Sequence, residues 1–256
     1  MKVLDLGDTQ EGRIFALIYG PSGTGKTHFV GTLGALGSVL VIDIDQGATT
    51  LKTAKDLKPY LKNIIACDFK LFKDLNSAAQ LIDANDPKRW NAHFNQGVSA
   101  TQQREWVTKP FDWIAWDTWS EIQWYMLEEL RSKDTEMRGS GLDFRKNIQI
   151  QHWGMMTDLN KLAVQNLRSC EVNQLFVMQE KADKDEVTGA RYGGPAIHGK
   201  MVNEMPTFFD VVIHSGTDLQ GQFVATTKAK GLWPAKTRLG EGKEYKNPTA
   251  KLVFGI

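Results

Sequence analysis

Apolar runs of strand length recur along the chain. They cover residues 14–19, 39–45, 111–118 and 172–178. Their apolar positions are nearly continuous, which is typical of strands that helices cover on both faces of a parallel sheet. The segments 119–130 and 153–167 instead place apolar residues at helical spacing. The pattern therefore predicts an α/β fold with a mostly parallel sheet flanked by helices.

The remaining segments give weaker signals. Phe208–His214 and Gln222–Thr227 flank turn residues, which predicts an antiparallel hairpin at the carboxyl-terminal edge of the sheet. A polar stretch from about 85 to 108 predicts a long surface excursion. A strand at 64–68 and a helix at 74–84 are also expected. In the helix at 153–167, the residues expected to face the sheet are Met155, Met156, Leu159, Leu162, Ala163 and Leu167.

Composition limits the classes of protein that the chain can belong to. Its 256 residues and 41% hydrophobic content are enough for one domain with a sizeable core, which we expect to span residues 1–256. The formal charge of +1 gives no global attraction to nucleic acid. Cys67 and Cys170 lack a C-x-x-C partner and are expected to be buried thiols. Without a spanning apolar run or a secretory signal, we expect a cytoplasmic protein with no membrane partner.

One motif is specific by itself. Residues 20–27 read GPSGTGKT, a full match to the phosphate-loop pattern G-x-x-x-x-G-K-[ST]. The glycines let backbone N–H groups turn onto phosphate oxygens, and a helix from Lys26 to Leu33 adds its positive dipole end. Lys26 is expected to reach the β- and γ-phosphates of ATP, and Thr27 to bind Mg²⁺. The predicted nucleotide-binding residues are Gly20, Pro21, Ser22, Gly23, Thr24, Gly25, Lys26, Thr27 and His28.

Polar residues end the other central strands. Asp43 and Asp45 end the run at 39–45, Asp117 ends the next, and Gln179 follows the last. Ligands bind at the carboxyl ends of parallel strands, so these side chains should face the nucleotide. Asp45 is predicted to orient the attacking water, and Asp117 to hold Mg²⁺ together with Thr27. Gln179 either senses the γ-phosphate or caps its strand.

The order of these parts resembles the RecA-type ATPase core, and more narrowly the phage-encoded RecA-like proteins that assist single-strand annealing and recombination. The matching pieces, between about residues 13 and 240, are GPSGTGKT at 20–27, VLVIDID at 39–45, DWIAWDT at 112–118, QHWG at 151–154, LFVMQ at 175–179, FFDVVIHS at 208–215 and AKTR at 235–238. The resemblance implies a RecA-like core that hydrolyses ATP by water attack on the γ-phosphate. Asp45 stands where that group usually has a glutamate.

The resemblance also implies partners. Two basic stretches, about 131–147 and 181–205, stand where the family has DNA-binding loops. Lys236 and Arg238 stand where basic residues of one subunit reach the ATP of its neighbour, which implies a filament or ring with ATP at the interface. Single-stranded DNA, further copies of the chain and a single-stranded-DNA-binding protein are the expected partners. The predicted DNA-contacting residues are Arg138, Arg145, Lys146, Arg191, His198 and Lys200; the predicted catalytic residues are Lys26, Asp45, Asp117, Gln179, Lys236 and Arg238.

Two other classes remain open at this point. A P-loop kinase would transfer the phosphate to a small acceptor, with the basic stretch from Arg131 to Arg145 as its lid. A DNA-annealing module would bind ATP to assemble and scarcely hydrolyse it, and the aspartate at position 45 favours this alternative. Turnover of ATP separates the annealing module from an active ATPase.

Overall fold

The computed structural model describes residues 12–72, 74–133, 150–184, 191–199 and 201–256. The strands are β1 (Phe15–Gly20), β2 (Val39–Asp43), β3 (Ile64–Asp68), β4 (Trp113–Asp117), β5 (Asn173–Lys184), β6 (Arg191–Pro195), β7 (Val211–Thr217), β8 (Phe223–Thr226), β9 (Lys236–Thr237) and β10 (Glu244–Lys246). The helices are α1 (Lys26–Thr32), α2 (Thr49–Thr53), α3 (Leu75–Ala84), α4 (Pro87–Phe94), α5 (Ile122–Lys133), α6 (Ile150–Ser169), α7 (Met201–Glu204) and α8 (Ala250–Phe254). None of these helices combines the length and apolar character needed to cross a membrane.

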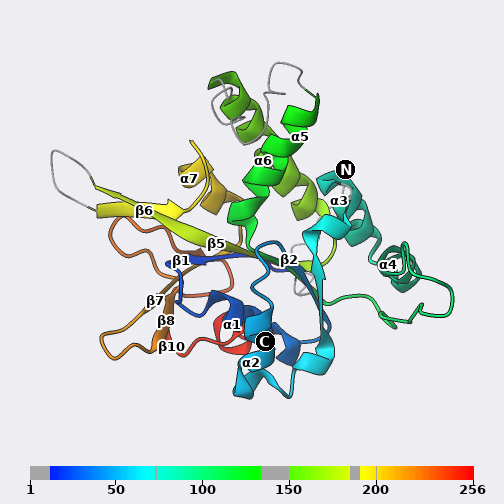
Figure 1. The fold of residues 1–256 in the computed structure, drawn as a ribbon. Coiled ribbons are helices and arrows are strands. Elements are labelled where there is room, and N and C mark those ends of the chain that lie inside the picture. Colours follow the sequence, from blue (N-terminus) through cyan, green and yellow to red (C-terminus); the bar gives the residue numbers. More distant parts are fainter. Residues whose placement is uncertain (1–11, 73, 134–149, 185–190, 200) are drawn as a thin grey trace.

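The strands form one mixed sheet in the order β10-β8-β7-β1-β5-β4-β2-β3 (Figure 1). Neighbouring strands from β7 to β3 are parallel. At the β7 edge, β8 and β9 pair antiparallel with β7, and β10 pairs antiparallel with β8. The predicted fold class is therefore confirmed: a mostly parallel sheet flanked by helices, with an antiparallel carboxyl-terminal hairpin.

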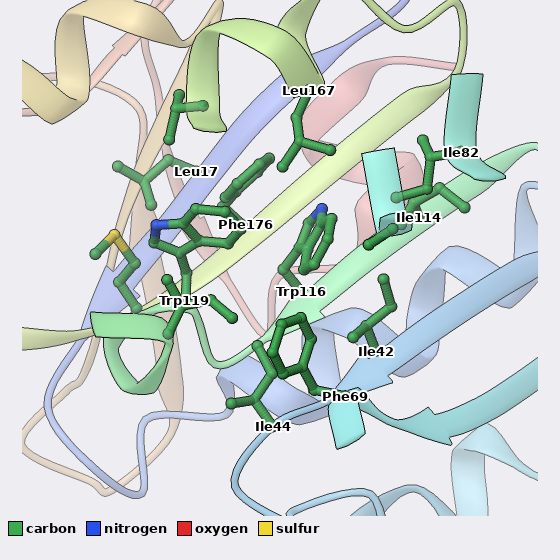
Figure 2. Close-up of a cluster of buried hydrophobic side chains, with 14 of the residues drawn as sticks. Leu17, Ile42, Ile44, Phe69, Ile82, Ile114, Trp116, Trp119, Leu167 and Phe176 are labelled. Atoms are coloured by element: carbon green, nitrogen blue, oxygen red, sulfur yellow. The ribbon is translucent and has the colours of Figure 1, made fainter. Parts of the chain in front are cut away.

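Side chains of the central strands alternate between two apolar layers. Leu17 and Tyr19 belong to the layer that also holds residues of α3, α5 and α6, whereas Ala16 and Ile18 belong to the layer shared with α1 and α8. Figure 2 shows the first layer, where Trp116, Trp119 and Phe176 pack between the sheet and α6. Side chains are buried in both layers, which explains why the strands read as nearly continuous apolar runs. Cys67 and Cys170 are buried free thiols, as predicted.

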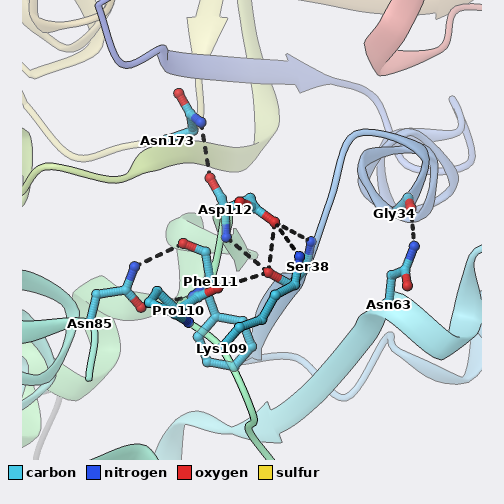
Figure 3. Close-up of polar contacts among 9 residues, drawn as sticks. All are labelled: Gly34, Ser38, Asn63, Asn85, Lys109, Pro110, Phe111, Asp112 and Asn173. Atoms are coloured by element: carbon cyan, nitrogen blue, oxygen red, sulfur yellow. Dashed lines mark hydrogen bonds and ion pairs between the residues drawn. The ribbon is translucent and has the colours of Figure 1, made fainter. Parts of the chain in front are cut away.

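Polar contacts at the amino ends of the strands set their relative register (Figure 3). The Asp112 carboxylate accepts hydrogen bonds from the Ser38 backbone N–H at 2.7 Å and the Ser38 hydroxyl at 2.8 Å. The Asn173 amide donates to the Asp112 carbonyl at 2.9 Å. These bonds join the starts of β2, β4 and β5. Asp43 and Asp117, at the far ends of β2 and β4, therefore lie directly opposite each other.

The expectation of an open excursion at 85–108 is wrong in part. Residues 87–94 form α4, and the side chain of Trp90 is fully buried. The side-chain oxygen of Asn91 accepts hydrogen bonds from the backbone N–H groups of Trp106 and Val107, which fixes the following segment. One tryptophan among polar residues gives little sequence signal, although it anchors the whole segment to the core.

The second basic stretch also differs from its prediction. β5 continues to Lys184 and pairs with β6, with Glu180 opposite Pro195. The resulting hairpin projects beyond the body of the sheet (Figure 1). Residues 181–205 therefore contain strand and helix in addition to loop. Most of the first stretch, residues 134–149, lies outside the described residues.

Helix α6 turns a different face to the sheet from the one predicted. Met155 and Leu162 are half exposed, whereas Met156 and Leu167 are buried as expected. The buried stripe includes two polar residues, His152 and Asn160. The Asn160 side-chain oxygen accepts a hydrogen bond from the Trp119 indole N–H at 3.0 Å, whereas its buried Nδ2 atom has no partner among the described residues. Leu159 is 37% exposed as well, so three of the six residues predicted to face the sheet lie toward solvent. The prediction missed His152 and Asn160 because it counted only apolar residues toward the buried face.

Candidate nucleotide site

The glycine-rich loop lies between the end of β1 and the start of α1. Gly25 caps α1 with a φ of 78°, and a Cβ there would lie 2.8 Å from the Phe223 ring. At Gly20, a Cβ would lie 2.3 Å from the carbonyl oxygen of Ser215. Gly25 is therefore required for its left-handed backbone and for the nearby Phe223 ring, and Gly20 is required because the Ser215 backbone lies so close. The loop has the conformation expected of a phosphate cradle, with α1 starting at Lys26.

Ser215 holds the loop from the neighbouring strand β7. Its hydroxyl lies 2.9 Å from the Thr24 hydroxyl and donates to the Tyr19 carbonyl at 3.1 Å. Thr24 in turn donates to the Pro21 carbonyl at 2.8 Å. Ser215 is not among the predicted site residues, because a single serine within a strand has no sequence signature of its own.

The Lys26 ammonium lies over the loop. It donates hydrogen bonds to the carbonyls of Gly20 at 2.8 Å and Pro21 at 2.6 Å. Burial lowers the pKa of Lys26, and the carboxylates of Asp117, Glu180 and Asp45 oppose that shift. The Lys26 ammonium is therefore partly buried at the loop, with acidic side chains near enough to stabilise its charge.

Asp117 is the buried acid of the site. Its residue is 3% exposed, and its Oδ2 atom has no hydrogen-bond partner in the structure. Burial raises the pKa of Asp117 to about 7, the Thr27 hydroxyl opposes the shift, and the charges of Asp45 and Asp43 add to it. A buried carboxylate oxygen without a partner is unfavourable unless a cation or a proton accompanies it.

Asp43 and Asp45 have different roles. The Asp43 carboxylate accepts hydrogen bonds from the backbone N–H groups of Gly47 at 2.9 Å and Ala48 at 3.2 Å, so it organises the turn before α2. Asp45 is exposed and accepts one bond from the Gly47 N–H at 3.0 Å. A Cβ at Gly47 would lie 2.9 Å from Asp45 Oδ1 and 3.9 Å from the Thr27 hydroxyl oxygen. Asp45 is therefore the solvent-exposed acid that follows β2.

The residues present fit Mg²⁺. The Thr27 hydroxyl hydrogen-bonds the buried Asp117 carboxylate, whose Oδ2 atom has no partner. Hydroxyl and carboxylate oxygens are ligands that suit a hard cation. Among the described residues, no three acidic, histidine or cysteine side chains gather closely enough to hold a metal alone. Thr27 and Asp117 would therefore hold the ion together with nucleotide phosphates.

Gln179 lies beside the loop. It stands opposite Gly20 in the β1–β5 register, and its backbone N–H donates to the Ser120 hydroxyl at 2.9 Å. Its exposed side chain follows Val177 on the face of the sheet that α1 covers. His28, in the first turns of α1, contacts Asp56 at 2.7 Å instead of pointing at the loop.

Lys236 and Arg238 lie toward the end of the strands that is opposite the phosphate loop. Lys236 pairs with Val212, which is level with Leu17, and the Arg238 N–H bonds the Asp210 carbonyl near Phe15. At roughly 3.3 Å per residue, these levels are about 10 and 17 Å from Gly20 along β1. Arg238 also forms an ion pair with Asp210 at 2.9 Å. The structure thus does not bring them to the phosphate loop of their own chain.

Few of the predicted DNA-contacting residues can be placed. Arg138, Arg145, Lys146 and Lys200 lie outside the described residues, and Arg191 is located only by its backbone in β6. His198 stacks on Trp153 at 4.0 Å between ring centroids. Burial and the charge of Lys181 lower the pKa of His198, so it offers a neutral ring at pH 7. The proposed kinase lid at 131–145 also lies mostly outside the described residues.

Comparison with known proteins agrees with this site. A family model described as an AAA domain matches residues 13–239, which include the loop and every strand-end acid named above. The chain belongs to this AAA domain family. No curated protein sequence matches it. The crystal structure of the RadB recombinase is similar to this AAA domain at 14% identity and a TM-score of 0.43, over 91% of this chain and 86% of that one.

Proposed function

We propose that this AAA domain is a Mg²⁺-dependent ATPase that binds single-stranded DNA and acts in phage recombination or strand annealing. One observation carries the ATPase part of the proposal. Next to the phosphate loop, the Thr27 hydroxyl hydrogen-bonds the buried Asp117 carboxylate, whose Oδ2 has no partner. These two oxygen ligands would hold a cation that also binds the phosphates of the nucleotide.

The chain's own groups would divide the work of hydrolysis. Backbone N–H groups of the loop and the Lys26 ammonium bind the phosphates, and Thr27 and Asp117 hold the metal. The exposed carboxylate of Asp45 orients a water molecule toward the γ-phosphate. Magnesium, when bound, neutralises charge on the β- and γ-phosphate oxygens. Gln179, in the middle of β5 and opposite Gly20, would sense the γ-phosphate.

The DNA-binding part is supported by the position of the β5–β6 hairpin. β5 passes the phosphate loop at Gln179 and runs without interruption into the projecting hairpin. A polyanion that contacts Lys181 or Lys184 would thus be connected by one strand to the nucleotide. Because Lys236 and Arg238 lie away from the phosphate loop of their own chain, any ATP that they contact would belong to another subunit.

The first test is the rate of ATP hydrolysis with and without single-stranded DNA, at low and moderate salt, with Lys26→Ala as the blank. The proposal expects Mg²⁺-dependent turnover that DNA stimulates, with a stimulation that declines as salt rises. Neither should occur in the blank. If DNA neither binds nor changes the rate in the presence of ATP, the DNA-binding part is refuted. Transfer of phosphate to an added small acceptor would instead support a kinase.

A specific observation keeps the annealing module as a second candidate. Asp45 is shorter than glutamate, and its Oδ1 atom is hydrogen bonded to the Gly47 N–H. A water-orienting carboxylate that is held back in this way would give slow turnover. This candidate expects ATP-dependent DNA binding at a hydrolysis rate no higher than that of Lys26→Ala. Fast turnover would exclude it.

A further inference from the structure

Two side chains meet on the face of β1 opposite α1. Glu180 comes from β5 and His214 from β7, the strands on either side of β1. His214 Nε2 lies 2.7 Å from Glu180 Oε2. An ionised carboxylate only accepts hydrogen bonds, so the imidazole donates. The bond therefore bridges β5 and β7 beside Tyr19, the residue immediately before the phosphate loop.

The rings around His214 fix this contact. The imidazole stacks on Tyr19 at 4.9 Å and on Trp233 at 5.1 Å, with interplanar angles of 22° and 3°. The Tyr19 hydroxyl donates to the Pro234 carbonyl at 2.7 Å, which attaches the same segment to β1. The side chains of Glu180 and His214 are 12% and 20% exposed. A contact this buried and this constrained loses little entropy on forming and holds its geometry well.

The pair also acts on the nucleotide site through charge. Burial lowers the pKa of Lys26, and Glu180 stands with Asp117 and Asp45 among the carboxylates that oppose this shift. On the other face of β1, the Ser215 hydroxyl donates to the Tyr19 carbonyl and lies 2.9 Å from the Thr24 hydroxyl oxygen. The start of the phosphate loop is thus held from both faces, by Ser215 on one and by the Glu180–His214 pair on the other.

We propose that Glu180 and His214 are positioning residues of the nucleotide site, forming a strap across β1 that holds the phosphate loop and Lys26 in the binding geometry. This inference rests on the proposed nucleotide binding. Glu180 also begins the β5–β6 hairpin, opposite Pro195. A movement of the hairpin would therefore pull on the strap directly.

The test is a double-mutant cycle read by the affinity for a fluorescent ATP analogue with Mg²⁺. Glu180→Ala and His214→Ala are each expected to weaken binding about tenfold, and the double variant no more than about threefold further, because either change breaks the same bond. Glu180→Gln keeps an oxygen that accepts the His214 N–H and is expected to stay within about threefold of wild type. Thermal unfolding of each variant verifies that it is folded.

The matched control is Asp56→Ala. Asp56 contacts His28 at the same 2.7 Å, but its side chain is 68% exposed. Removing it should leave affinity unchanged. Independent effects that multiply to about 100-fold, or no effect of either alanine variant, would overturn the strap. If Glu180→Ala does not fold, failure of Glu180→Gln to retain affinity overturns it equally. A wild-type chain that does not bind the analogue would instead refute the proposed nucleotide binding on which the strap depends.

Discussion

We expect the buried carboxylate of Asp117 to lower the stability of the nucleotide-free protein while it serves the nucleotide site. Replacing Asp117 by Asn keeps the shape of the side chain and removes its charge. In the folded protein, burial raises the pKa of Asp117 from 3.8 to about 7. A raised pKa means that its contribution to stability is fully present below pH 4 and is lost as the pH rises through 7. Above that window, the ionised carboxylate destabilises the nucleotide-free protein, so Asp117→Asn should stabilise it.

The size of the effect follows from the pKa shift. A rise of about three units corresponds to about 4 kcal/mol, at about 1.4 kcal/mol per unit. About two of these three pH units, from pH 5 to the folded-state pKa of about 7, lie within the range from pH 5 to pH 8. The difference in unfolding free energy between Asp117→Asn and wild type should thus widen by up to about 3 kcal/mol over this range in favour of the variant.

Urea unfolding at pH 5 and pH 8, without nucleotide, measures this difference directly. Effects of the new amide that do not depend on pH cancel between the two conditions. Asp112→Asn is the control: although burial favours a raised value, bonds from Ser38 and the charge of Lys109 lower the pKa of Asp112. Because the pKa of Asp112 is lowered, this carboxylate stays ionised over the tested range, and the stability difference for the variant should be flat from pH 5 to pH 8.

Mg²⁺ with ATP should reverse the ranking. A cation favours the ionised carboxylate, so binding stabilises the wild type and releases protons below pH 7. Asp117→Asn should show neither effect. An Asp117→Asn advantage that changes by less than about 0.5 kcal/mol between pH 5 and pH 8 would refute the buried, cation-seeking carboxylate.

Three further changes test other parts of the structure. Gly25→Ala should lose about 1–3 kcal/mol of stability in urea unfolding and abolish ATP-analogue binding, because its left-handed φ and the Phe223 ring both exclude a methyl group. An undisturbed affinity would contradict the loop geometry. Trp90→Ala should lose about 3–5 kcal/mol through the cavity it leaves, while nucleotide affinity is retained at a temperature where the variant is folded. Asp45→Asn should lower kcat about 100-fold with little change in ATP affinity, and an unchanged kcat would show that another group orients the water.

The sequence alone determined the local parts of the site. The loop at 20–27 could be recognised because its glycines, Lys26 and Thr27 act through neighbouring backbone and need no distant contact. The buried central strands and the acid that ends β4 could also be predicted, since burial on both faces imposes a continuous apolar pattern. Asp117 was therefore predicted beside Thr27, and the structure places it there.

Only the tertiary structure decided which distant residues join that site. Ser215 and the Glu180–His214 pair reach the loop because β5 and β7 flank β1, an order that no local pattern encodes. The same applies to Trp90 and Asn160, whose burial depends on partners far along the chain. Local spacing specifies conformation and exposure to a first approximation. The strand order, and with it the neighbours of each polar group, follows from packing of the whole core.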